Sequence, residues 1–482
     1  MEITFNYIRN RIREHSKEEL LQFCHNVLDD KRDKIKPIWF VFLLMKWTYL
    51  YGGEKNPSKP LTPQKASKIL KSITDFNQEH ITDFMKDGGI HRAFHILYSQ
   101  QFYLQTSVYR EKFATQLKLY STISGKYDIQ RSFETKTGFK IVDFLFLMQV
   151  IWLYTNIDRL EKPSISFSGY LTNNFLKMAS ELTNVDKVKK LLQLLVLDPI
   201  NPNEKINSFK RNLKSQELQS MERTFFTLYP LQYFNNKIKV IHLSVFNYSL
   251  NYYIYDYLKS FDDNFTTEFG NRFEKYIEFG IKELNCPYIR ENELKKQLPK
   301  NSKVVDFVID KNIFVECKAI EVQAYASVNP TDELIYNSLK DSLIKAYFQQ
   351  LLNVAKTLNG DKENWGIILT YKKLYWSQFS DLYDITKHNF EETLDTMHIP
   401  PENVFIIDIH TWDRIISIIN DEEISLIEIL KIAKNNNSVV TTKKQSFDMH
   451  LDVFKNNPLN LNYLKDEIEE LNIAKKHYPQ QQ

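Results

Sequence analysis

The stretch SKVVDFVIDKNIFVECKAIEV, residues 302–322, constrains the fold of this chain more than any other segment. Successive side chains of a β-strand point to opposite faces of a sheet, so residues two apart share a face. A hairpin formed by this stretch places Asp306 on one face of its first strand, and Glu316 and Lys318 on the corresponding face of its second. We therefore predict two carboxylates and one ammonium group on the same face of a single hairpin.

The length of the turn decides whether these charges meet. Asp306 and Glu316 are equally far from Lys311, so a three-residue turn over 310–312 places them directly opposite each other, with Cβ atoms about 5 Å apart. We expect Asn312 to adopt the left-handed conformation at the end of this turn, because its short polar side chain tolerates a positive φ. A two-residue turn would instead leave the carboxylates on opposite faces.

The three charged groups suit the hydrolysis of a phosphodiester. Carboxylate oxygens are the hard ligands that Mg²⁺ prefers, and a bound metal acidifies a water molecule that can attack phosphorus. Lys318 could orient or deprotonate that water, or offset negative charge in the transition state. Two neighbouring carboxylates without a cation repel each other, so the arrangement predicts a bound divalent cation, Mg²⁺ or Mn²⁺.

An acidic residue on a helix, an Asp on one strand and Glu-x-Lys on the next resemble the PD-(D/E)XK superfamily, the restriction-endonuclease-like nucleases. The matching residues are Glu274 in FGNRFEKYIEFGIKEL, then Asp306, and then Glu316-Cys317-Lys318. The resemblance covers roughly residues 262–420, and Val305 stands where the motif's eponymous proline would precede Asp306.

The resemblance also implies an order of elements and a role for each residue. The expected elements are a helix at 266–284, strands at 303–309 and 312–318, a helix at 333–358, a strand at 365–371, and a further strand and helix at 403–419. Asp306, Glu316 and the backbone carbonyl of Cys317 are implied to bind the metal. Glu274 would assist from its helix, and Lys318 would serve the attacking water.

Plainer interpretations stay open for several of these residues. Asp, Glu and Lys on adjacent strands also form solvated, salt-bridged surfaces, and this spacing arises often by chance. Gln350 on the long helix is a candidate auxiliary residue, because relatives of the superfamily place a polar helix residue beside the metal. A glutamine at the edge of the core with satisfied hydrogen bonds is the alternative.

Charge alone does not identify a nucleic-acid-binding protein here, because 63 Lys and Arg against 60 Asp and Glu leave a formal net charge of only +3. Contact with DNA would depend on local basic patches that neutralise phosphates. Four lysines lead directly into the hairpin and are the predicted nucleic-acid-binding residues: Lys295, Lys296, Lys300 and Lys303. Such runs are also common on solvated faces.

Other sequence features bear on compartment and cofactors. Three scattered cysteines fit neither a disulfide framework nor a zinc module. The N-terminus lacks a signal-peptide pattern, and the most apolar runs, 37–45 and 144–154, are too short to span a bilayer. Neither G-x-x-x-x-G-K-[ST] nor G-x-G-x-x-G occurs. We therefore expect a cytoplasmic protein with no membrane partner and no nucleotide cofactor.

We predict an α+β chain, in which a largely α-helical N-terminal region precedes a C-terminal restriction-endonuclease-like α/β domain with a central mixed sheet flanked by helices. The predicted parts are a helical recognition or assembly region at 1–250, a nuclease domain at 251–433, and a polar linker with a C-terminal helix and tail at 434–482. Three-and-four spacing of apolar residues supports the helices of the first part. Its expected interruptions are a small hairpin at 124–140 and a strand at 238–243.

These features predict a Mg²⁺-dependent deoxyribonuclease. Fusion of such a domain to an unrelated helical region resembles bacterial genome-defence nucleases that act on phage or plasmid DNA. One alternative is a non-catalytic subunit that binds nucleic acid or assembles a larger complex, and another is a nuclease acting on RNA. A second protein subunit or a homo-oligomer is a further expected partner.

Overall fold

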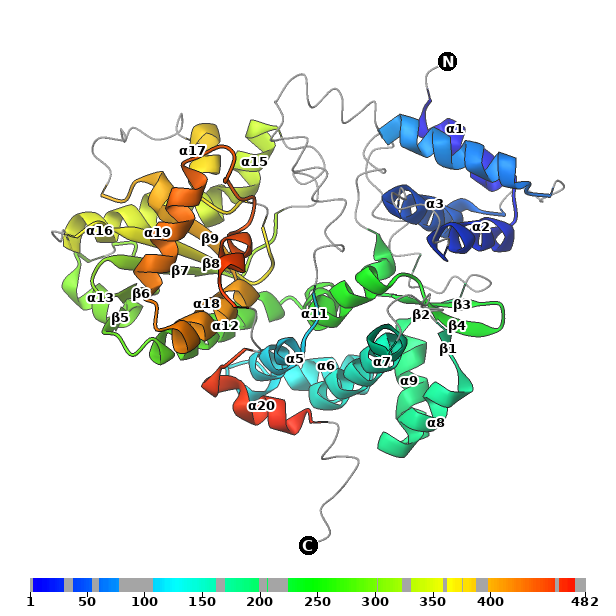
Figure 1. Cartoon of the computed structure of the whole chain (residues 1–482), viewed down its shortest axis with the longest axis horizontal. Helices are drawn as coiled ribbons and strands as arrows, with labels where there is room; N and C mark the ends of the chain where they lie inside the picture. Colours follow the sequence, from blue (N-terminus) through cyan, green and yellow to red (C-terminus); the bar gives the residue numbers. More distant parts are fainter. Residues whose placement is uncertain are drawn as a thin grey trace, which may run out of the picture.

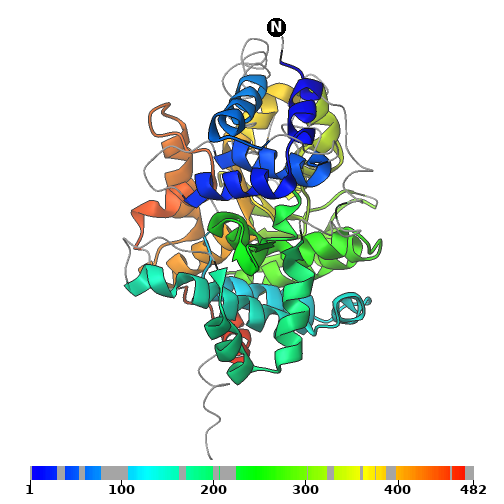
Figure 2. The same ribbon diagram turned by 90° about the vertical axis from the view of Figure 1, so that its right-hand side faces the viewer.

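The computed structural model describes residues 3–29, 38–53, 60–77, 107–161, 170–198, 206, 224–300, 302–322, 331–358, 362–374, 376–386, 398–455 and 459–472. Over these ranges the chain is a mixed α/β protein with two mixed sheets, one of four strands and one of five (Figure 1). Figure 2 shows the first helices of the chain stacked above those that follow residue 140, with the smaller sheet between them.

Helices dominate the described residues before 260. They are α1 (Phe5–Arg13), α2 (Lys17–Asp29), α3 (Ile38–Tyr51), a helix over 63–77, α5 (Arg110–Leu117), the π-helical η2 (Lys118–Thr122), α6 (Ile129–Thr137), α7 (Ile141–Glu161), α8 (Asn173–Leu182), α9 (Val185–Leu195), the 3-10 turn η4 (Phe225–Thr227) and α11 (Leu243–Lys259). The predicted helical character of this region is therefore confirmed for the residues described.

The hairpin predicted at 124–140 is wrong, because α6 occupies most of that stretch. Asp128 caps the helix by accepting a hydrogen bond from the Arg131 amide at 2.9 Å, and Gly138 ends it in the left-handed conformation with φ of 71°. An Asp before a helix and a Gly after it are ordinary helix boundaries. The glycine marks a helix end and not a turn between strands.

The smaller sheet has the strand order β1-β4-β3-β2. Its strands are β1 (Tyr170–Leu171), β2 (Val196–Leu197), β3 (Leu231–Phe234) and β4 (Lys237–Val240). The strand predicted at 238–243 therefore ends at Val240, because His242 already caps α11 and accepts from the Ser244 amide at 3.2 Å. Helix α11 also runs through the boundary predicted at residue 250.

The larger sheet has the order β5-β6-β7-β8-β9. Strand β6 is antiparallel to both β5 and β7, whereas β8 is parallel to β7 and β9 is parallel to β8. The strands are β5 (Tyr288–Arg290), β6 (Phe307–Ile309), β7 (Ile313–Lys318), β8 (Trp365–Thr370) and β9 (Val404–Asp408). The expected strands are present, but β6 begins at Phe307 and not at residue 303, and β5 was not foreseen.

Helices connect these strands and cover the sheet on both sides (Figure 1). They are α12 (Phe265–Glu283), α13 (Glu291–Gln297), α15 (Asp332–Leu339), the π-helical η5 (Lys340–Ile344) and η6 (Ala346–Leu351), α16 (Leu352–Leu358), α17 (Ser380–Thr386), the 3-10 turn η9 (Pro401–Asn403), α18 (Ile409–Glu422) and α19 (Leu426–Asn437). A central mixed sheet flanked by helices is therefore present.

The alternation of β7 decides which residues reach which layer. Ile313 and Val315 belong to a large buried cluster that includes α12, α18 and the N-terminal helices. Phe314 belongs to a second buried cluster that includes the helical stretch 332–358. Since the first cluster is continuous with the helical region, the two predicted regions share a hydrophobic core.

The polar linker predicted from residue 434 is wrong for the residues described. Residues 434–437 complete α19, and Phe447 and Leu451 in the 3-10 helix η10 (Phe447–Val453) are buried. After the short η11 (Asn462–Leu464), α20 (Lys465–Glu470) packs against α5. Two apolar residues four apart thus anchor an otherwise polar segment.

Within the described ranges, no single helix is long and apolar enough to cross a membrane, although the bent pair Ile129–Thr137 and Ile141–Asn156 passes that test of length and composition together.

Candidate functional site

The β6–β7 hairpin has the register that places its two acidic residues together. Phe307 pairs with Val315 and Ile309 pairs with Ile313. Continuing this ladder by one step sets Asp306 opposite Glu316, as the three-residue connection predicts. The predicted register is confirmed, so both carboxylates lie on the face of the sheet that α15, η6 and α16 cover.

The turn reaches this register in a different way from that expected. Asp310 and Lys311 have positive φ values of 50° and 69°, whereas Asn312 is not left-handed, so that prediction is wrong. Two consecutive left-handed residues give a turn whose twist matches that of the paired strands. The Asn312 side chain instead donates a hydrogen bond to the Glu363 carbonyl at 2.8 Å, which holds the segment that enters β8.

Backbone contacts hold Asp306 directly before β6. One carboxylate oxygen, Oδ2, accepts a hydrogen bond from the Cys317 amide at 2.7 Å. The Asp306 carbonyl accepts from the Glu291 amide at 2.8 Å, where β5 leads into α13. Residue 317, whose carbonyl is the predicted third metal ligand, therefore also orients the first.

Glu316 is the most buried member of the cluster, with 2% of its surface exposed. Its Oε1 accepts from Lys318 Nζ at 2.5 Å and from Gln350 Nε2 at 2.6 Å. Its Oε2 is also buried, and no hydrogen bond to it is found among the described residues. One oxygen of this carboxylate is thus held in place, while the other lacks a donor.

Gln350 joins the cluster from the helical layer that covers this face of the sheet, in the π-helical segment η6. Besides Glu316, its side-chain amide donates to the Val304 carbonyl at 3.1 Å, two residues before Asp306. Its own Oε1 is buried, with no described partner, so Gln350 is not a fully satisfied glutamine of the core edge. It ties Glu316 to the chain that carries Asp306.

Burial and mutual repulsion dominate the electrostatics of the cluster. Burial and the nearby Glu316 raise the pKa of Asp306 to about 7, against the opposing effects of the Cys317 amide and Lys318. Burial also raises the pKa of Glu316, although Lys318 counteracts it. Burial and the charge of Asp306 raise the pKa of Glu274 on α12 to about 7. Glu274 thus lies close enough to Asp306 for their charges to interact, and it approaches from the helix on the other side of the sheet.

These residues fit a hard divalent cation. Two carboxylates face each other, their pKa values are raised, and Glu316 Oε2 has no described donor. A cation bound between them would remove the repulsion and supply the missing partner. Among the residues described, no three His, Cys, Asp or Glu side chains form a ligand set on their own. The predicted set has two side chains and the carbonyl of Cys317, so it is not of that kind.

The four predicted nucleic-acid-binding lysines are all exposed. Lys295 lies on α13 and forms an ion pair with Glu291 at 2.6 Å. No ion pair is found for Lys296, Lys300 or Lys303 among the described residues. The carbonyl of Lys303 accepts a hydrogen bond from the Asn353 side chain at 2.8 Å, one helical turn beyond Gln350. The same helix therefore supports both the lysine-bearing segment and Glu316.

Two buried polar clusters have no counterpart among the sequence predictions. One surrounds Asp413 on α18, and the other surrounds Lys372, two residues after β8. Each charged residue is next to a second charged residue, Arg414 or Lys373, in a segment rich in apolar side chains, and this pattern does not single it out. Their partners lie at least 50 residues away in the sequence, so no local pattern reveals the contacts.

The chemistry of the Asp306–Glu316 cluster has to be inferred from its own geometry, because no protein-family model matches this chain and no curated protein or solved structure matches it either.

Proposed function

We propose that this protein is a Mg²⁺-dependent nuclease that hydrolyses DNA phosphodiester bonds. The observation that carries the proposal is the convergence of Asp306, Lys318 and Gln350 on the buried carboxylate of Glu316. A merely solvated strand pair would leave these groups exposed and in contact with water. Burying two facing carboxylates is unfavourable unless a cation or a proton compensates them.

The order of elements is a second support. Helix α12 precedes the antiparallel strands β5, β6 and β7, a long helical stretch follows, and β8 then lies parallel to β7. This succession is the one expected of a restriction-endonuclease-like domain, with Asp306 directly before its second strand and Glu316 on its third. A similar order of elements supports this chemistry, but the proposal depends on the residues of the site.

Each residue has a role that its contacts support. Asp306, Glu316 and the Cys317 carbonyl would hold Mg²⁺, which supplies charge neutralisation and an acidified water when it is bound. Gln350 keeps Glu316 in its orientation through the 2.6 Å hydrogen bond. Lys318 donates to Glu316 and is therefore assigned as a donor that orients the attacking water and offsets negative charge on the phosphate.

Proton transfer can be assigned to a residue near this cluster. Hydrolysis joins the water oxygen to phosphorus, breaks the bond from phosphorus to the leaving oxygen, and moves a proton from the water. Glu274, with a pKa raised to about 7 by burial and by Asp306, can accept or return a proton near neutral pH. Exposed lysines on the segment before Asp306 would bind the DNA backbone. A role in bacterial defence against phage or plasmid DNA, with a second subunit or a homo-oligomer, remains part of the proposal by analogy.

The experiment compares cleavage of plasmid, linear DNA and RNA by the purified protein, with Mg²⁺ or with EDTA. DNA should be cut only with Mg²⁺, and Asp306→Asn and Lys318→Ala should each lower the rate by at least about 100-fold. The hairpin offers matched controls in Asp310→Asn and Lys311→Asn. These remove the same charges from left-handed positions that Asn tolerates, and they should cut at the normal rate.

Equal cutting by Asp306→Asn and the unsubstituted protein would refute the assignment of the site. Cleavage of RNA alone would change the substrate class and keep the site. Binding of nucleic acid with no cleavage under any metal would favour the non-catalytic subunit instead.

A further inference from the structure

A buried lysine lies behind the proposed site, at the carboxyl end of β8. The Lys372 side chain is only 6% exposed, and it forms ion pairs with Asp256 on α11 and with Glu321. Its ammonium nitrogen also lies near three aromatic rings of α11. The distances from Nζ to the ring centroids are 5.7 Å for Tyr248, 5.3 Å for Tyr252 and 5.0 Å for Tyr255. Such a setting favours a cation that is kept in one place.

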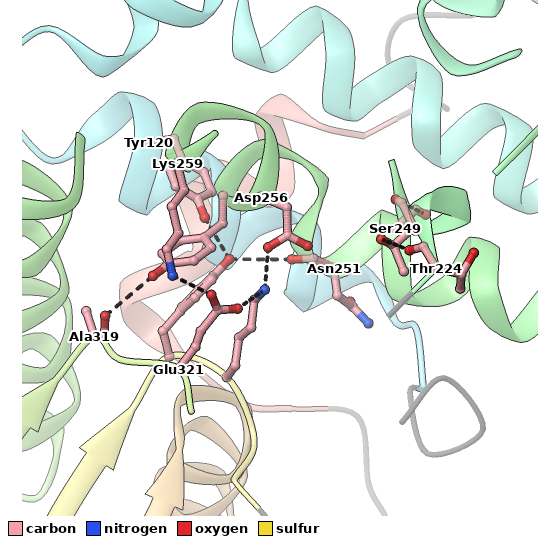
Figure 3. Close-up of polar contacts among 12 residues, drawn as sticks. Tyr120, Thr224, Ser249, Asn251, Asp256, Lys259, Ala319 and Glu321 are labelled. Carbon is pink, nitrogen blue, oxygen red and sulfur yellow. Dashed lines mark hydrogen bonds and ion pairs between the residues drawn. The ribbon is translucent and has the colours of Figure 1, made fainter. Parts of the chain in front are cut away.

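Glu321 is held from two directions. Besides Lys372, it forms an ion pair with Lys259 at the end of α11, at 2.5 Å. Figure 3 shows Lys259 directed toward Glu321, with Asp256 beside them on the same helix as Lys259. Two lysines and two carboxylates therefore meet in a cluster in which Lys372 is buried and Lys259 is exposed. Moving the segment that carries Glu321 away from α11 would break these ion pairs and leave Lys372 buried without its partner. Such a movement is therefore strongly disfavoured.

Glu321 is only three residues beyond Lys318, and the chain between them is tied down. The Ile320 amide donates to the Lys318 carbonyl at 2.7 Å, and the Tyr255 hydroxyl donates to the Ala319 carbonyl at 3.4 Å (Figure 3). Lys318 is also the ladder partner of Thr370, whose hydroxyl donates to the Lys372 carbonyl at 2.8 Å. Lys372 thus contacts the chain three residues beyond Lys318, and its backbone is bonded to the residue that pairs with Lys318 in β8.

We propose that Lys372 is a positioning residue for Lys318. By holding Glu321 against α11, it fixes the path of the chain directly after β7 and so fixes the direction from which the Lys318 ammonium reaches Glu316. A lysine side chain has four flexible methylenes, so a constrained backbone is needed to keep its ammonium at one point. The same cluster connects the site to α11, the helix that joins it to the N-terminal helices.

The kinetic consequence rests on the proposed nuclease function, but the structural consequence does not. The first experiment therefore needs no activity. The intact protein is treated with a small amine-reactive reagent, and mass spectrometry measures the modification rate of Lys318. In Lys372→Met, Lys318 should react severalfold faster, because its ammonium is no longer held on Glu316. Lys296, which is exposed on α13, provides the internal reference rate.

Lys373→Met is the matched control. It removes a lysine from the adjacent position, but that lysine pairs with Asp448 at 2.7 Å and not with Glu321. Its Lys318 should react at the normal rate. Lys372→Arg keeps the charge, and Glu321→Gln removes the other partner. If Lys372→Met fails to fold, the comparison uses the other two variants. Lys318 should be modified faster in Glu321→Gln, and in Lys372→Arg it should react almost as slowly as in the unsubstituted protein.

The second experiment measures DNA cleavage. Lys372→Met should lower the turnover number by about 10- to 100-fold, while the Mg²⁺ concentration for half-maximal rate stays unchanged, since Asp306 and Glu316 are intact. Combining Lys372→Met with Glu321→Gln should cost less than the sum of the two, because the pair acts as a unit. An unchanged modification rate of Lys318 in folded Lys372→Met and Glu321→Gln proteins would overturn the proposal. Absence of cleavage by the unsubstituted protein would refute the nuclease function. The modification rates of Lys318 would then still decide whether Lys372 positions it.

Discussion

Two aspartates of this protein, the half-buried Asp306 and the buried Asp413, have similarly raised pKa values and different surroundings. Burial raises the pKa of Asp306 and of Asp413 to about 7 in each case. Asp413 is 1% exposed and accepts hydrogen bonds from three hydroxyl groups. The donors are Tyr276 at 2.9 Å to each oxygen, Tyr463 at 2.7 Å and Thr115 at 3.2 Å. These donors come from α12, η11 and α5, so Asp413 joins three elements to α18.

Asp306 instead faces a second carboxylate. Glu316 lies opposite it in the ladder, and Glu316 Oε2 has no described donor. A raised pKa therefore does not distinguish a structural junction from a reactive site. The number of donors and the sign of the facing charges do, because three hydroxyl groups already stabilise Asp413, whereas Asp306 and Glu316 repel each other and share the single ammonium group of Lys318.

The largest expected difference between the two is in stability. Asp413→Ala leaves three buried hydroxyls without their acceptor and should lower the free energy of unfolding by about 3 kcal/mol. Asp306→Asn removes a repulsion with Glu316 and should change it by less than about 1 kcal/mol in metal-free protein. Urea unfolding at pH 7.5 in EDTA measures both. Destabilisation of similar size in the two variants would contradict the distinction.

A smaller effect that distinguishes Asp306 from Asp413 is the dependence of stability on pH and on Mg²⁺. The unfolded-state pKa of these carboxyls is about 4, so the folded protein binds more protons between about pH 4 and 7. The stability that these groups contribute is present below about pH 4 and is lost as pH rises through about 7. The melting temperature in EDTA should therefore fall over this window. Mg²⁺ should reverse the part due to Asp306 and Glu316, adding about 1.4 kcal/mol at ten times its dissociation constant.

The metal effect should grow with pH, because Mg²⁺ competes with protons for the carboxylates. It should vanish in Asp306→Asn and persist in Asp413→Asn, since Asp413 has three hydroxyl donors and no facing carboxylate. A Mg²⁺-induced shift of equal size in Asp306→Asn and the unsubstituted protein would show that the cation binds elsewhere.

The smallest expected effect concerns the surroundings of the two aspartates. Exposed lysines precede Asp306, so Lys296→Gln, Lys300→Gln and Lys303→Gln should each reduce the slope of log affinity for DNA against log salt by about 0.9 for every phosphate that the lysine neutralises. Binding is measured in EDTA by fluorescence anisotropy. Lys282→Gln on α12, whose lysine pairs with Glu278 at 3.3 Å, is the control. Equal slopes in all four variants would remove these lysines from the DNA interface.

Several features could be predicted because they are local. Alternation along 302–322 placed Asp306, Glu316 and Lys318 on one face, and the number of residues between the strands set their register. The left-handed residue was misassigned, because the tolerance of Asn for a positive φ is a weak preference that contacts elsewhere in the molecule override. Asn312 was drawn to the Glu363 carbonyl, 51 residues away.

Other features depended on segments distant in the sequence. Helical periodicity predicted that Gln350 lies on the side of its helix that meets the sheet. Only the packing of η6 on β7 showed that its amide reaches both Glu316 and Val304. The linker predicted from residue 434 was wrong because composition does not report that Phe447 and Leu451 find a buried surface.

The amino-acid sequence by itself therefore determined the acidic hairpin and its register, since both follow from side-chain alternation and the length of a turn. Tertiary structure decided that Glu316 is buried, that Glu274 approaches from the opposite layer, and that Lys372 ties the end of β7 to α11. The physical reason is that burial and charge compensation arise between surfaces that meet only when the helices pack on the sheet.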